Sequence, residues 1–294
     1  MSAADPAETA GAPRQRPGRH QSFLAYRNFR FLKIAAAAVV LAIVLYVVDQ
    51  PYGARYGGTW AGYALGIAGA LLILWLMWFG YRKRCYRKDQ GNLAAWLSAH
   101  VYLGLALLVI ATLHTGFHFG WNVHTLAYAL MCLVIASGAF GVYCYARYPR
   151  LMTENRHGLI LAQMLGRIAS LDDELRRAAL EVDDRTAALV QRSVAGTAIG
   201  GSLRQQLSGR YPNCATAAAL SGLDRITQSA PLAEGSGLRQ VRVLLDEKGQ
   251  LLARARRDIS YKAMMDVWLY IHVPLSFALL AALLAHIISV FYLW

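Results

Sequence analysis

The chain has 294 residues, of which 56% are hydrophobic and only 16% are charged, and its formal net charge is +13. Soluble globular domains carry about 25% charged residues, so this composition excludes an ordinary soluble protein and indicates an integral membrane protein. Much of the positive charge flanks apolar segments, where anionic lipids attract it. We therefore expect the lipid bilayer as a partner and no nucleic acid.

Five stretches approach the roughly 20 apolar residues that cross a bilayer. In chain order they are residues 34–48, 60–78, 93–113, 126–145 and 267–293. We predict an all-α integral membrane protein with an N-terminal tail (1–30), transmembrane helices one to four (31–145), a mostly helical insert domain (146–262) and transmembrane helix five (263–294). Within the second stretch, Gly62, Gly66 and Gly69 have the small-residue spacing of helix packing, which we favour over a cofactor role.

The distribution of Lys and Arg predicts the orientation, because basic loops stay on the cytoplasmic side. The tail and the loop after the second stretch are rich in basic residues, whereas residues 49–59 contain only Arg55 and residues 115–125 contain none. We expect a bacterial inner membrane protein whose N-terminus and insert domain are cytoplasmic and whose C-terminus is periplasmic.

The insert domain begins with apolar residues at helical spacing, and its last part, residues 238–262, continues toward the fifth stretch without a proline. Its middle, residues 196–237, is richer in Gly, Ser and Pro. This composition predicts loops with short helices, or else a small pair of strands.

Four histidines lie within two of the apolar stretches at the same separation: His100 and His114 in the third, His272 and His286 in the fifth. Fourteen helical residues advance about 1400° and rise about 21 Å, so each pair shares one helix face near opposite leaflets. An imidazole inside a bilayer is costly unless it has a partner. The third and fifth helices both run outward, which places His100 level with His272 and His114 level with His286.

In this H-x13-H repeat on its third and fifth helices the chain resembles the di-haem b-type membrane cytochromes, namely cytochrome b and the ferric reductase or NADPH oxidase transmembrane domains. The resemblance covers about residues 60–294 without the insert. It implies a haem-binding four-helix bundle with two bis-His haem b groups. His100 and His272 would ligate the inner iron, and His114 and His286 the outer one.

The implied function is electron transfer across or within the bilayer, between a quinone/quinol pool and a redox partner. The chain lacks the Pro-Glu-Trp-Tyr signature of quinol oxidation, and we expect flavin and nicotinamide sites to belong to other redox subunits of a membrane complex. Gly104, one turn after His100, would let a porphyrin approach the backbone. Pro274 should bend the fifth helix just after His272.

Three further residues near the outer surface, His118, Trp121 and His124, form a candidate quinone or proton site. His118 shares a helical face with His114 and would be a rival ligand. The spacing of 14 on both helices favours His114. Two other functions stay open: a non-redox membrane scaffold that anchors the insert domain to a larger complex, and a metal-ion pathway lined by the same histidines.

Overall fold

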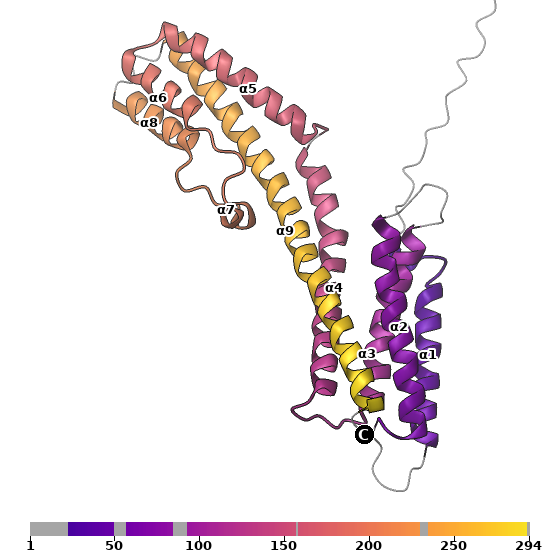
Figure 1. Ribbon diagram of the computed structural model, residues 1–294. Helices are drawn as coiled ribbons and strands as arrows, with labels where there is room; N and C mark the ends of the chain where they lie inside the picture. Colours follow the sequence, from indigo (N-terminus) through magenta and orange to yellow (C-terminus); the bar gives the residue numbers. More distant parts are fainter. Residues whose placement is uncertain (1–22, 50–56, 85–92, 157, 230–234, 293–294) are drawn as a thin grey trace, which may run out of the picture. The chain divides into compact units, whose positions relative to one another are not determined.

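The computed structural model describes residues 23–49, 57–84, 93–156, 158–229 and 235–292, and these residues form helices and connecting turns without a β-strand (Figure 1). Five of their helices are long and apolar enough to cross a membrane. The all-α prediction and the five apolar helices are thus confirmed. By its internal contacts the chain divides into two compact units, residues 1–118 and 119–294.

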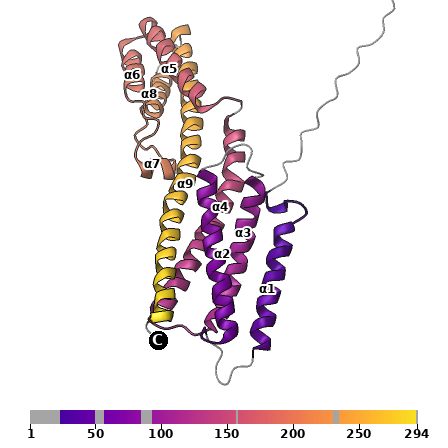
Figure 2. The same cartoon turned by 45° about the vertical axis from the view of Figure 1, so that its right-hand side comes forward.

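The first unit consists of a short 3-10 turn, η1 (Phe23–Ala25), and three helices that can be followed in Figure 2: α1 (Arg30–Val48), α2 (Trp60–Arg84) and α3 (Leu93–Thr115). Helix α3 packs against both α1 and α2. Ala42, Leu65 and Ile110 form a small core where the three helices meet. Large apolar side chains on the other faces, such as Leu41 and Ile67, are more than 60% exposed, as expected of a surface that meets lipid.

The second unit is built on two long helices, α4 (Val123–Arg156) and α9 (Ser236–Tyr292). Between them the chain forms α5 (Leu161–Ala178), the 3-10 turn η2 (Ala179–Glu181), α6 (Asp184–Ala195), α7 (Leu203–Ser208) and α8 (Ala215–Ser229). The middle of the insert therefore contains loops and short helices as predicted. The alternative pair of strands does not occur in its described part.

Both borders that we predicted for the insert domain fall inside continuous helices, since α4 runs past residue 145 and α9 begins well before residue 262. Helix α9 extends for 57 residues and includes Pro274. The insert is thus held at each end by an extension of an apolar helix.

Helices α4 and α9 pack against each other in antiparallel orientation, because successive contacts involve earlier residues of α4 and later residues of α9. Near the insert, the side chain of Arg156 donates two hydrogen bonds to Asp258, at 2.9 and 2.8 Å. Farther along, Tyr148 stacks on Tyr261 with ring centroids 5.4 Å apart. The same antiparallel pairing continues away from the insert, toward the start of α4 and the end of α9, and includes His272 and His286.

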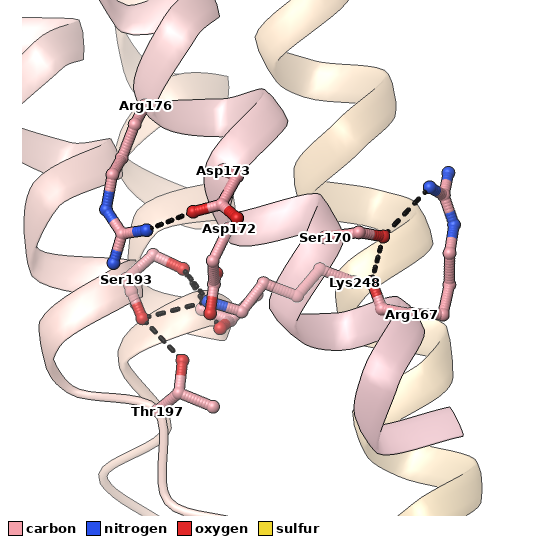
Figure 3. Close-up of polar contacts among 9 residues, drawn as sticks. Arg167, Ser170, Asp172, Asp173, Arg176, Ser193, Thr197 and Lys248 are labelled. Carbon is pink, nitrogen blue, oxygen red and sulfur yellow. Dashed lines mark hydrogen bonds and ion pairs between the residues drawn. The ribbon is translucent and has the colours of Figure 1, made fainter. Parts of the chain in front are cut away.

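The insert has an apolar core of its own, and one cation is enclosed in it (Figure 3). Lys248 of α9 is fully buried, with its Nζ 2.5 Å from Oδ1 of Asp172 on α5. The same Nζ donates to the carbonyl oxygen of Ser193 on α6 at 3.1 Å. A buried charge is tolerated only with such partners, so this network ties three helices together.

Candidate functional site

His114, the second histidine of α3, is anchored to α2 by its Nδ1 atom. That nitrogen lies 2.7 Å from the carbonyl oxygen of Gly62. A carbonyl oxygen only accepts hydrogen bonds, so Nδ1 must carry the ring proton. The lone pair of the neutral imidazole then resides on Nε2, which is the tautomer of an Nε2 metal ligand.

The glycines of α2 make room for this ring. A Cβ added to Gly66 would lie 2.7 Å from Cε1 and 3.0 Å from Nδ1 of His114. In the turn before α2, a Cβ added to Gly57 would lie 3.2 Å from the same Cε1. Gly69 faces Leu107 instead, at an ordinary 3.7 Å. The predicted small-residue packing of α2 therefore exists, and its closest contact is with the imidazole of His114.

His100, the other histidine of α3, is half-buried beside Phe79 of α2, with ring centroids 5.0 Å apart and planes at 41°. One turn further along α3, a Cβ added to Gly104 would meet no other group within 4 Å. The surface of α3 next to His100 is thus clear at the position where we predicted close approach of a planar cofactor.

In the second unit, His272 of α9 is oriented by Ser137 of α4. The Nδ1 atom of His272 lies 2.8 Å from the hydroxyl oxygen of Ser137, and that hydroxyl donates its proton to the carbonyl oxygen of Val134, also at 2.8 Å. A serine hydroxyl has a single proton, so it must accept from His272. His272 is therefore protonated on Nδ1 and, like His114, carries its lone pair on Nε2.

Trp268 completes the support of His272, and the sequence pattern did not reveal it. The indole stacks on the imidazole with centroids 5.3 Å apart and planes at 28°. Its Nε1 donates to the carbonyl oxygen of Ser137 at 2.6 Å. Gly141 lies directly under the indole, where a Cβ would overlap the ring, and a Cβ on Gly138 would meet His272 at 3.4 Å. The small residues in this otherwise apolar stretch of α4 were the available signal.

His286, nearer the end of α9, contacts His124 in the first turn of α4. Their Nδ1 atoms are 2.5 Å apart, and the rings are edge to face, with centroids separated by 4.6 Å and planes at 88°. His124, predicted as part of an outer quinone or proton site, is thus a direct neighbour of a predicted ligand. The antiparallel course of the two helices places both histidines at the same level.

The other two residues of the predicted outer site are exposed. Helix α3 ends at Thr115, and Gly116 and Phe117 follow in left-handed conformation with φ of 56° and 63°. The expectation that His118 shares a helical face with His114 is therefore wrong. Its Nδ1 instead lies 2.8 Å from the carbonyl oxygen of Gly116. The ring of Trp121 is fully exposed, so the second unit does not join Trp121 and His124 into one site.

The pairs His100 with His272 and His114 with His286 join residues of the two units and stay predictions. Among the described residues, no group of three or more His, Cys, Asp and Glu side chains could hold a metal ion. Comparison of the chain with protein families, curated proteins and solved structures gave no match.

Proposed function

We propose that this protein is a di-haem membrane cytochrome b that conducts electrons through the bilayer. The observation that carries the proposal is the shared state of His114 and His272. In each, the Nδ1–H group donates to a fixed acceptor on a neighbouring helix, the Gly62 carbonyl for His114 and the Ser137 hydroxyl for His272. Each therefore offers the Nε2 lone pair that a haem ligand needs. A histidine with only a structural role in the helix interface would not need this tautomer.

The residues fit two bis-His haem groups in their chemistry. Imidazole nitrogens are good axial ligands, and two of them fill both axial positions, which favours electron transfer over reaction with oxygen. Four such ligands at matched spacing support two cofactors, one nearer each leaflet. When bound, these groups would supply two one-electron redox centres; His100 and His272 would hold the inner one, and His114 and His286 the outer one.

The proposed setting follows from the charge distribution. The N-terminus and the insert domain would lie in the cytoplasm of a bacterium, and the C-terminus in the periplasm. Arg87 and Lys88, in the basic loop after the second apolar stretch, lie outside the described residues. Electrons would pass between a quinone/quinol pool and another redox subunit of a membrane complex, and the insert domain would be available to bind that subunit.

A second candidate, a membrane scaffold without redox function, is favoured by one observation. Asp258 of α9 is only 2% exposed, and its two carboxylate oxygens accept hydrogen bonds from Nε and Nη2 of Arg156 on α4. This ion pair would hold together the extensions of α4 and α9 that carry the insert domain, as anchoring requires. Haem binding distinguishes the two candidates, because a scaffold needs no cofactor.

The test is the haem content of detergent-purified protein from cells supplied with haem, with a reduced-minus-oxidised spectrum. We expect two non-covalent b haems per chain. His100→Ala or His272→Ala should leave one, and the exposed His118→Ala, the matched control, should leave two. In liposomes that enclose ferricyanide, external dithionite should reduce it only when wild-type protein is present. Absence of haem from the wild-type protein would overturn the proposal and favour the scaffold.

A further inference from the structure

We infer that His124 is the positioning residue of His286: it accepts a hydrogen bond from Nδ1 of His286 and thereby aims Nε2 of that ring at the outer iron. This inference rests on the proposed function. It assigns to His124 a role different from the quinone or proton site predicted above, and the contact between the two rings carries it.

The proton count across the contact gives the first step. Two Nδ1 atoms 2.5 Å apart share one proton, so one imidazole donates and the other accepts. If His286 ligates iron through Nε2, that nitrogen has no proton, and the proton of its neutral ring must reside on Nδ1. His286 is then the donor. His124 accepts on its own Nδ1 and keeps its proton on Nε2.

The position of His124 is fixed by the start of α4. The side-chain oxygen of Asn122 accepts a hydrogen bond from the backbone N–H of Thr125 at 2.9 Å, and the N–H of Leu126 donates to the Asn122 carbonyl at 3.1 Å. This capping holds the first helical turn, in which His124 lies half-buried. The accepting ring is thus presented from a rigid element, as a residue that orients a ligand must be.

The chemical identity of the acceptor distinguishes the proposed outer centre from the inner one. His272 donates to a serine hydroxyl and His114 to a backbone carbonyl, whereas His286 donates to an imidazole nitrogen. Imidazole is the most basic of these three acceptors, so it draws the Nδ1 proton most strongly and makes His286 a more electron-rich ligand than His114 or His272. A richer ligand stabilises ferric over ferrous iron, so His124 should lower the midpoint potential of the outer haem.

The experiment is a potentiometric redox titration of detergent-purified protein carrying both haems, followed in the visible spectrum. His124→Leu removes the acceptor, and His124→Asn places an amide oxygen near the position of Nδ1. With His124→Leu we expect one midpoint potential to rise, by about 59 mV for each tenfold loss of ferric preference, and the other to stay unchanged. His124→Asn should restore part of the shift. Ser137→Ala, the matched control, should move the other centre.

Each outcome decides a separate point. A wild-type protein without haem overturns the proposed function itself. Two haems in the wild type, with unchanged potentials in His124→Leu, overturn the positioning role alone. Loss of one haem in both His124 variants, with the other haem retained and the protein monodisperse, would show that His124 is itself a ligand. If His124→Leu does not fold, His124→Asn and His124→Gly decide. A midpoint potential raised more in His124→Gly than in His124→Asn supports the inference, and wild-type potentials in both variants overturn it.

Discussion

Gly66 provides a sharp test of how His114 is held. Replacement by alanine adds one methyl group 2.7 Å from Cε1 and 3.0 Å from Nδ1 of His114, closer than side-chain carbons pack. The imidazole must move, and its hydrogen bond to Gly62 is then lost. Gly69→Ala is the matched control, because it makes the same change in the same helix, where the nearest atom, on Leu107, is 3.7 Å away.

The expected magnitudes follow from the two environments. Alanine is favoured over glycine in a helix interior by about 1 kcal/mol, which should stabilise Gly69→Ala by up to that amount. For Gly66→Ala, overpacking costs about 1–3 kcal/mol, and loss of the hydrogen bond costs about 1 kcal/mol more. After the helix gain is subtracted, Gly66→Ala should be destabilised by about 1–3 kcal/mol.

The assay compares thermal unfolding and haem content of both variants with wild type in the same detergent. Gly66→Ala should unfold at lower temperature and lose part of one haem signal, whereas Gly69→Ala should keep both haems and match or exceed wild-type stability. If Gly66→Ala proves as stable as Gly69→Ala and retains its full haem spectrum, the placement of His114 against α2 is incorrect.

Three further predictions concern the second unit. The methyl group added by Gly141→Ala would overlap the indole of Trp268, so this change should destabilise the protein. It should also reduce the signal of the haem that His272 would ligate, measured in the reduced-minus-oxidised spectrum. Asp172→Asn leaves buried Lys248 without its counter-ion and should cost about 3–5 kcal/mol, measured as loss of hydrogen-exchange protection in α5, α6 and α9. Burial raises the pKa of the Cys214 thiol, but backbone N–H groups at the start of α8 and the Arg256 guanidinium outweigh it, so the net pKa is lowered. Alkylation of Cys214 should therefore continue at pH values below those at which an ordinary thiol reacts. Arg256→Met should shift this pH profile to higher pH.

Each of these has its own control. Gly138→Ala, whose added Cβ would lie 3.4 Å from Cε1 of His272, should destabilise the protein less than Gly141→Ala does. Adding Lys248→Met to Asp172→Asn should recover stability, because the unpaired buried charge is then removed; no recovery would contradict the ion-pair argument. A Cys214→Ser protein gives the background labelling, and a profile in Arg256→Met identical to wild type would show that the guanidinium does not stabilise the thiolate.

The sequence determined the helical class and the five apolar segments, because backbone groups in a bilayer can be satisfied only within helices or closed barrels, and the lengths of the apolar runs are read directly. It also indicated short helices in the middle of the insert. It further indicated that the last part of the insert leads into the fifth apolar segment without a proline, as α9 does. It did not indicate that α4 continues past residue 145 to Arg156, because polar residues at helical spacing continue a helix as well as apolar ones do.

For the candidate site, the histidine spacing alone selected His100, His114, His272 and His286, since a ladder along one helix depends only on its regular rise. The partners of these rings were decided by tertiary structure. Gly62, Ser137 and His124 reach them from other helices, and no local pattern shows which side chains meet across an interface. The end of α3 at Thr115, which removes His118 from the shared face, likewise depends on two left-handed residues that only the folded backbone displays.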